Sequence, residues 1–212
     1  KTAGTSITQM LDMTTIEQLF YCGTTTQYVN THKEYAKYFT YEQYSNLLCR
    51  PPQHFTLQEK KKILGEKLFD DYFVFSVVRN PYARLVSAFI KAQLRYAGSF
   101  GFNSFEEFID INLFKIDDYE RDSKFQGHLQ LQSFYLLDKN NSLNSLDTIF
   151  KFENLNECYE IIKTKYPGIP FLHSNAAPNK YDFKTYYTEE LRQKVFNFYK
   201  QDFENFGYSS TL

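Results

Sequence analysis

The chain of 212 residues contains no tryptophan and has only 8 glycines, 6 prolines and 3 cysteines. This shortage of glycine and proline excludes a fibrous chain and a low-complexity disordered chain, because both are rich in these residues. Neither sign of charge dominates, since 24 lysines and arginines stand against 25 aspartates and glutamates, for a formal net charge of -1. The balance argues against a general nucleic-acid binder, which normally carries a clear basic excess.

The three cysteines, Cys22, Cys49 and Cys158, are odd in number and form no CxxC pair, and the four histidines form no HxxxH pair. We therefore expect three free thiols and no structural zinc site, with a single disulfide in an oxidising compartment as the alternative. No apolar run approaches the roughly 18 residues that a membrane span needs. The chain begins at Lys1, without a methionine, inside what looks like a loop. We expect a fragment whose preceding strand, and any signal or anchor, is missing.

The residues that are abundant are aromatic or lysine. There are 22 Phe and 18 Tyr, and the basic residues divide into 18 lysines and only 6 arginines. We interpret this skew as a coding bias, so that a single lysine or tyrosine is weak support for a function. Because arginine is scarce, its positions are more informative.

Short apolar runs alternate with amphipathic helical patterns, which favours one α/β domain. The segment FVFSVV at 73–78 is apolar on both faces apart from Ser76. Such a pattern is typical of a central parallel strand that is covered by helices. The segment LDTIFKF at 146–152 predicts a second strand.

Helix boundaries are marked by capping residues. Thr56 and Ser104 are each followed by glutamate three residues later, which is the spacing of a capping box. A further helix is predicted from Thr188 to about Gly207. The lysines at 60–62 lie on the first of these helices, where we expect a solvated face rather than a surface that steers an anionic glycan.

The opening segment, KTAGTSI, is the first that indicates chemistry. Gly4 permits a tight turn before a helical pattern, so that the free amides of residues 4–6 point outward at the helix N-terminus and can bind an oxyanion. Lys1 adds a positive charge, and Thr5 and Ser6 add hydroxyl donors. A simple helix cap at one of these two hydroxyl residues is the alternative. The segment does not match the G-x-x-x-x-G-K-[ST] loop of nucleoside triphosphatases, because its lysine precedes the glycine.

The second such segment is VVRNPYARLVSAF at 77–89. Arg79 is expected at the carboxyl end of the first strand, where open parallel sheets bind ligands. Pro81 then begins a helix at a position where its missing amide costs nothing. A guanidinium group together with the hydroxyl of Ser87 suits a phosphate monoester. For Ser87 the alternative is a small helical residue that only packs, and for Arg84 we favour an ordinary pairing with a surface acid.

Together, these two segments resemble the phosphosulfate loop and the 3′-phosphate motif of sulfotransferases that use 3′-phosphoadenosine 5′-phosphosulfate (PAPS). The closer likeness is to the carbohydrate sulfotransferases, which include bacterial members and the Golgi heparan-sulfate and chondroitin enzymes. Later segments fit in the same order, so the similarity covers essentially the whole chain: HLQLQSFYLLD at 128–138, LDTIFKFENL at 146–155 and YYTEELRQKVFNFYKQDFENFGY at 186–208. The resemblance implies a P-loop-type central parallel sheet flanked by helices, whose first strand is missing here.

The resemblance also implies a reaction, the transfer of a sulfuryl group from PAPS to a hydroxyl of a carbohydrate acceptor, without a metal. Lys1 matches the lysine beside the 5′-phosphosulfate, which implies stabilisation of the leaving group. Arg79 and Ser87 match the pair that holds the 3′-phosphate. The loop around the 5′ end corresponds to Thr2, Ala3, Gly4, Thr5 and Ser6.

An acceptor hydroxyl needs a general base, which in this branch is usually a histidine or a glutamate. We predict His54 in PPQHFTLQEKKKIL, because related sequences carry a histidine at a similar place upstream of the arginine motif. An exposed loop histidine beside Pro51 and Pro52 is the alternative. His32 is the second candidate for the base.

Several polar residues of the later segments have less certain roles by the same resemblance. His128 and Gln132 form an H-x-x-x-Q pattern, which either lines the acceptor cleft or forms a satisfied core pair. His173 and Asn175 fall where the family has a loop that closes over the nucleotide. Glu153, at the end of the second strand, is expected to cap or pair structurally rather than to catalyse.

Two other functions stay open from the sequence. One is a P-loop enzyme of another kind, such as a kinase that transfers a phosphoryl group, and the other is a catalytically silent glycan-binding module. The expected partner is a carbohydrate or glycan acceptor, with no nucleic acid. The expected location is the cytoplasm for a bacterial protein, or the Golgi lumen, with a membrane anchor in the missing N-terminus, for a eukaryotic one.

Overall fold

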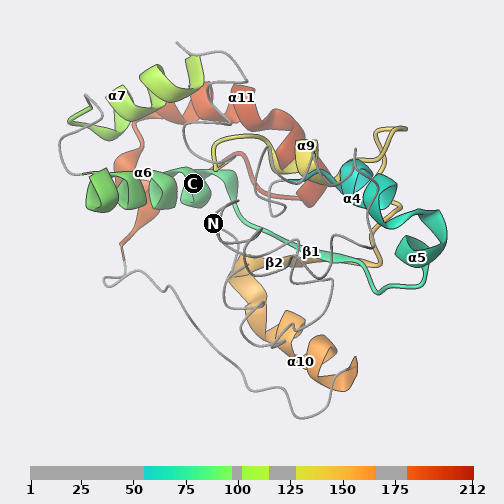
Figure 1. Ribbon diagram of the computed structural model, residues 1–212. Coiled ribbons are helices and arrows are strands. Elements are labelled where there is room, and N and C mark those ends of the chain that lie inside the picture. Colours follow the sequence, from blue (N-terminus) through green and yellow to red (C-terminus); the bar gives the residue numbers. More distant parts are fainter. Residues whose placement is uncertain (1–54, 97–101, 115–127, 166–180) are drawn as a thin grey trace.

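The computed structural model describes residues 55–96, 102–114, 128–165 and 181–212 (Figure 1). Among these residues, helices and strands follow one another as expected of an α/β chain. In chain order the elements are α4 (Leu57–Leu64), α5 (Glu66–Asp70), β1 (Phe75–Val78), α6 (Pro81–Tyr96), α7 (Phe105–Ile109), the π-helical turn η4 (Asp110–Phe114), α9 (Gln132–Leu136), β2 (Thr148–Lys151), the 3-10 turn η5 (Phe152–Asn154), α10 (Leu155–Lys165), the 3-10 turn η6 (Phe183–Tyr186) and α11 (Glu189–Phe206).

Strands β1 and β2 form a parallel pair, as predicted for the two apolar segments. Their register runs from Phe75 opposite Thr148 to Val78 opposite Lys151. In the part of the chain that the structure describes, the sheet consists of these two strands. Because parallel strands present their carboxyl ends at the same edge, the residues that follow β1 and β2 lie next to each other.

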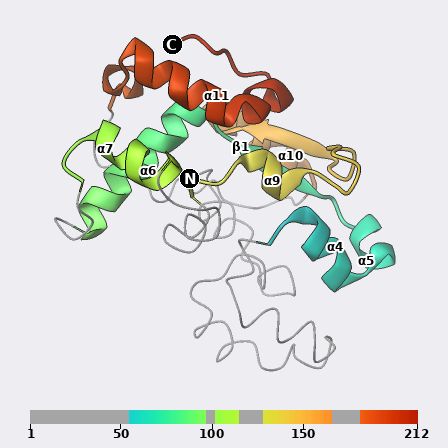
Figure 2. The same cartoon turned by 90° about the horizontal axis from the view of Figure 1, so that it is seen from above.

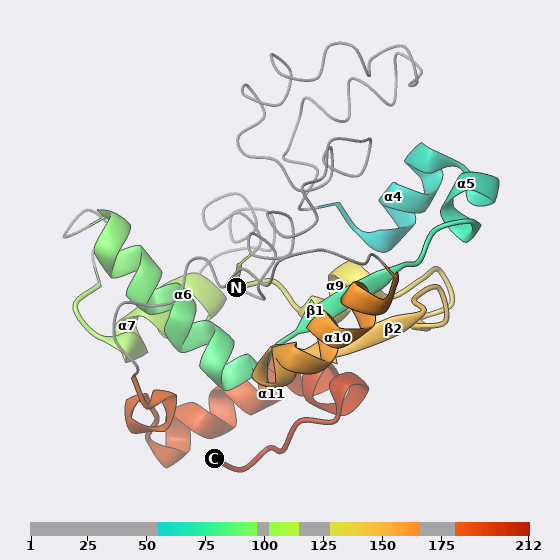
Figure 3. The ribbon, with the colours of Figure 1, turned by 90° about the horizontal axis from the view of Figure 1, so that it is seen from below.

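Helices lie on both sides of the strand pair. Figures 1 and 3 show α10 on one side, with α9 and α11 on the other. The α10 side buries Cys158 and Ile162 against Val77 of β1 and Phe150 of β2. Strands covered on both sides are expected to be apolar throughout, which explains the continuous apolar run of the first strand.

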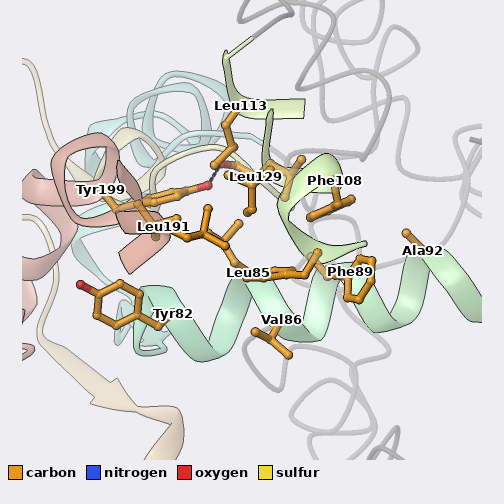
Figure 4. Packing of buried hydrophobic residues seen from close by; sticks show 14 of the residues in the cluster. Tyr82, Leu85, Val86, Phe89, Ala92, Phe108, Leu113, Leu129, Leu191 and Tyr199 are labelled. Atoms are coloured by element: carbon orange, nitrogen blue, oxygen red, sulfur yellow. Dashed lines mark hydrogen bonds between the residues drawn. The ribbon is translucent and has the colours of Figure 1, made fainter. Parts of the chain in front are cut away.

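The larger core lies where α6 packs against α7, η4 and α11 (Figure 4). Tyr82, Leu85 and Phe89 project from α6 into this core, in which the hydroxyl of Tyr199 donates a hydrogen bond to the carbonyl oxygen of Leu129. Seen from above, α6 and α7 lie toward one end of the strands, and α4 and α5 toward the other (Figure 2). The position of α6 is therefore fixed by a large buried surface.

The predicted start of α4 is confirmed in both of its hydrogen bonds. The hydroxyl of Thr56 accepts from the amide of Glu59 at 3.2 Å, and the Glu59 carboxylate accepts from the amide of Thr56 at 2.7 Å. The second predicted capping box is only half right. Ser104 caps α7, but the carboxylate of Glu107 accepts from the amide of Asn103 at 2.6 Å.

Helix α11 has the predicted boundaries. The hydroxyl of Thr188 accepts from the amide of Leu191 at 3.2 Å, and Gly207 ends the helix in the left-handed region with φ 60°. Glycine suits that position because it has no Cβ to clash there. No helix in the described ranges combines the length and the apolar character needed to cross a membrane.

The three lysines of α4 do not share one solvated face. Lys62 is exposed, and Lys61 pairs with Asp70 on α5 at 3.1 Å. Lys60 is partly buried, and this burial lowers its pKa to about 8 against the opposing effect of Glu59. The sequence expectation is therefore wrong for Lys60, because the short helix turns this position toward the protein.

Candidate anion-binding site

Arg79 lies directly after β1, in the two-residue connection to α6. The next residue, Asn80, caps α6, since its side-chain oxygen accepts from the amides of Tyr82 at 2.9 Å and Ala83 at 3.3 Å. Pro81 begins the helix, as predicted. The strand, the cap and the helix therefore fix the place of Arg79 in the fold.

The guanidinium group of Arg79 lies over the ring of Phe152, 4.4 Å from its centroid. Phe152 is the first residue after β2, so the parallel register brings this ring beside Arg79. Within the described residues no carboxylate pairs with this guanidinium, and its buried Nε atom donates to no partner. A half-buried cation without an acid is an energetically demanding arrangement, which a bound anion would relieve.

Ser87 lies on α6, seven residues after Asn80, so two helical turns place both residues on the same side of the helix. Its side chain is partly buried and makes no hydrogen bond to another described residue. Lys91 follows one turn further on, with its Nζ atom 3.4 Å from Nε2 of His128. This side of α6 therefore presents a hydroxyl group and then a cation.

Arg84 has a different role from the one expected. It is only 4% exposed, and its Nη1 atom lies 3.7 Å from the carboxylate of Asp202, which is itself fully buried. The same guanidinium donates to the carbonyl oxygens of His128 and Gln130. The prediction of an acidic partner is right, but the partner is a core residue of α11 and not a surface acid.

The H-x-x-x-Q pattern does not form one contact pair. Gln132 is 7% exposed and bonds to the backbone of Arg79 on both sides: the Arg79 amide donates to its Oε1 at 2.9 Å, and its Nε2 donates to the Arg79 carbonyl at 3.0 Å. The ring of His128 faces Lys91 instead. Gln132 is thus a buried residue with satisfied hydrogen bonds, and it fixes the backbone of Arg79.

Glu153 has the structural role that we expected. Its carboxylate accepts from the amide of Asn80 at 2.9 Å and from the hydroxyl of Tyr208 at 2.8 Å. Burial and this hydrogen bond raise the pKa of Tyr208, against the opposing effect of Arg79. Glu153 therefore ties the turn after β2 to the cap of α6.

The remaining predicted site residues lie outside the described residues. They are Lys1, Thr2, Ala3, Gly4, Thr5, Ser6, His32, His54, His173 and Asn175. Of the predicted cofactor-binding residues, the structure therefore places Arg79 and Ser87, both on the β1–α6 unit. The described ranges contain no group of three or more histidine, cysteine or acidic side chains that could hold a metal ion.

Two residues of this region were missed by the sequence interpretation. Asp202 continues the buried spacing of Val195 and Tyr199 on α11, and an acid on a core face signals a buried cationic or amide partner. Phe152 carried no separate signal among 22 phenylalanines. Its importance follows only from the strand register.

In the described ranges, an arginine without an acidic partner follows a parallel strand and precedes a capped helix, which is the place where α/β proteins bind their ligands. The model of the sulfotransferase family matches residues 1–209, and the chain belongs to this family. The activity that this membership assigns is the transfer of a sulfuryl group to an acceptor. No curated protein and no solved structure matches the chain.

Proposed function

We propose that this protein transfers the sulfuryl group of PAPS to a hydroxyl group of a carbohydrate, within a single sulfotransferase domain. The observation that supports the donor is the guanidinium of Arg79, which has no acidic partner among the described residues. It lies at the end of β1, where α/β sheets bind their ligands. The likeness of the later segments to carbohydrate sulfotransferases supports the acceptor.

The 3′-phosphate of PAPS fits the chemistry of Arg79 and Ser87. A phosphate monoester carries roughly 1.5 to 2 negative charges at neutral pH and three acceptor oxygens. One face of the Arg79 guanidinium is covered by Phe152, which leaves the N–H edge for a planar two-bond contact with phosphate. The hydroxyl of Ser87 supplies a further donor. A lysine would lack the planar edge, which explains an arginine in a lysine-rich chain.

In the proposed reaction, His54 accepts the proton of the acceptor hydroxyl, with His32 as the second candidate for this base. The hydroxyl oxygen then attacks sulfur as the bond from sulfur to the bridging phosphate oxygen breaks. Adenosine 3′,5′-bisphosphate leaves with the bonding electron pair. Lys1 stabilises the charge on the bridging oxygen, and Thr2 to Ser6 surround the 5′ end. No metal takes part.

The nucleotide is tested first, by titrating the protein with adenosine 3′,5′-bisphosphate and with ATP plus magnesium while the melting temperature is measured. We expect stabilisation by the bisphosphate alone. Arg79→Ala should weaken bisphosphate binding by about tenfold to a hundredfold, as expected from the ~1.5–3 kcal/mol of a charged hydrogen bond. Arg192→Ala is the matched control, because Arg192 is also partly buried but pairs with Glu189 and donates to the carbonyl oxygen of Ser210.

Unchanged affinity in Arg79→Ala, or stabilisation by ATP with magnesium instead, would overturn the proposed donor. Turnover of labelled PAPS on a panel of glycans tests the acceptor. His54→Ala should lower this turnover and leave nucleotide affinity nearly intact. If His32→Ala does so instead, the base is His32. Nucleotide binding without transfer to any glycan would favour a silent binding module.

A further inference from the structure

The backbone of Arg79 is held by one side chain. The carboxamide of Gln132 accepts from the Arg79 amide at 2.9 Å and donates to the Arg79 carbonyl at 3.0 Å. Arg79 lies one residue past the last β1–β2 pair, between Val78 and Lys151. Gln132 therefore bonds to Arg79 in the way that a neighbouring strand would. These two hydrogen bonds fix the backbone of Arg79, and with it the direction in which the Arg79 side chain leaves the backbone.

Gln132 is itself held in the protein interior. Its backbone amide donates to Oδ2 of Asp202 at 2.8 Å, and the amide of Ser133 donates to Oδ1 at 2.8 Å. Asp202 pairs in turn with Arg84. Arg84, Asp202 and Gln132 thus form a buried polar network that joins α6, α11 and α9, and each of the three is no more than 7% exposed.

The network ends at Arg79, the residue proposed to bind the 3′-phosphate. Its last two hydrogen bonds go to Arg79, whose guanidinium lies over Phe152 and has no acidic partner in the part of the chain that the structure describes. A side chain that binds a dianion gains affinity when it is held in the binding direction before the ligand arrives. A core polar network serves that purpose because its hydrogen bonds hold its members in one geometry, although Nε of Arg84 donates to no partner among the described residues.

We infer that Gln132 is a positioning residue for the 3′-phosphate of the nucleotide, acting through the backbone of Arg79 and touching no ligand. This inference rests on the proposed function. The inference distinguishes a positioning role of Gln132 from a purely structural one, because a residue that served only the fold would affect the affinity for all nucleotides equally. A residue that aims Arg79 affects the nucleotides that carry a 3′-phosphate.

The test compares the affinities for adenosine 3′,5′-bisphosphate and for adenosine 5′-monophosphate, measured by calorimetry on the full chain. We expect Gln132→Met to lower the preference for the bisphosphate by about tenfold, the order of one to two hydrogen bonds, with the affinity for the monophosphate nearly unchanged. Gln132→Met in the Arg79→Ala background should have no further effect, because the two changes then remove the same contact.

Gln130→Met is the matched control. Gln130 is 8% exposed, against 7% for Gln132, and among the described residues its side-chain oxygen accepts from the adjacent amide of Leu131 at 3.1 Å and does not contact Arg79. This variant should keep the nucleotide preference of the wild type. If Gln132→Met does not fold, as judged from its thermal unfolding, Gln132→Asn takes its place. That variant keeps the amide and adds no charge beside the carboxylate of Asp202, whose Oδ2 lies 3.4 Å from Nε2 of Gln132. Its side chain is one methylene shorter and cannot make both hydrogen bonds to Arg79, so it too should lose the preference.

Two results would overturn the inference while the proposed function stands. One is a variant of Gln132 that keeps the wild-type preference while Arg79→Ala loses it. The other is an equal loss of affinity for both nucleotides, which would show a role in folding alone. A wild-type protein that does not distinguish the nucleotides would instead overturn the proposed function, and this inference with it.

Discussion

Replacing Asp202 by asparagine tests whether the buried polar network stabilises the fold. The side chain keeps its size, but the negative charge opposite Arg84 is lost. One carboxylate oxygen also becomes an NH₂ group. In the wild type, the two oxygens of Asp202 each accept a backbone amide at 2.8 Å, one from Gln132 and one from Ser133. The new NH₂ group must therefore face one of these donors.

The size of the effect follows from distance and burial. Charges 3.7 Å apart interact by about 4.5 kcal/mol at an effective dielectric constant of 20. Because Arg84 and Asp202 are 5% and 0% exposed, removing one charge leaves the other uncompensated, which typically costs about 3–5 kcal/mol. We expect Asp202→Asn to lower the free energy of unfolding by this amount.

Asp70→Asn provides the comparison within the same chain. Asp70 is closer to its partner Lys61, at 3.1 Å, but the two side chains are 64% and 30% exposed. A surface pair of this kind contributes at most about 1 kcal/mol. Distance alone would rank the two variants in the opposite order from burial. The experiment therefore separates these two physical causes.

The assay is urea unfolding at 25 °C, followed by far-ultraviolet circular dichroism because the chain has no tryptophan to report by fluorescence. The free energies of unfolding of the wild type and the two variants are compared with the same m-value, the slope of free energy against urea concentration. A loss below about 1 kcal/mol in Asp202→Asn, or equal losses in the two variants, would refute the reasoning that burial makes the Asp202 contacts strong.

Two further predictions follow from shifted pKa values. Burial, aided by Glu157, raises the pKa of Cys158 to about 11, so little of this thiol is ionised at pH 8 in the folded protein. In a variant with Cys22 and Cys49 changed to serine, the folded protein should therefore react with iodoacetamide at pH 8 at least ~100-fold more slowly than the unfolded protein. Equal rates, followed by mass spectrometry, would contradict this. Burial lowers the pKa of Lys60 to about 8, against about 10.4 in an unfolded chain. Between these two pH values the unfolded state binds more protons than the folded state, so Lys60 makes the free energy of unfolding rise with pH in this range. In Lys60→Met this contribution is lost, and an unchanged dependence of unfolding free energy on pH from 8 to 10 would show that Lys60 titrates normally.

Much of the fold could be predicted because its signals are local. The strand at 75–78 follows from a continuous apolar run, and the caps at Thr56 and Thr188 follow from side chains that bond amides three residues away. The extra residues predicted at the strand ends, such as Phe73, belong to the same apolar run but lie outside the paired ladder. Strand ends depend on the partner strand, which a local pattern does not contain.

The site was predicted only in part, for the same physical reason. Arg79 was chosen as a candidate because a scarce residue follows a strand, and the structure places it directly after β1. Its connections to Phe152 and Gln132 join residues more than 50 positions apart, which no spacing in the sequence reveals. Arg84 was placed on the surface because an arginine is rarely buried, and its buried partner Asp202 comes from a helix at the other end of the chain.

The register of β1 and β2 offers a way to separate correctly folded molecules from molecules whose strands are misaligned. Val78 opposite Lys151 is the last pair, so the ring of Phe152 meets Arg79 only in this alignment. A slip by one residue would turn the paired side chains to opposite faces and part the ring from the guanidinium. With the nucleotide site proposed above, retention on an immobilised nucleotide would sort refolded molecules by strand alignment, which spectroscopic measures of helix content do not detect.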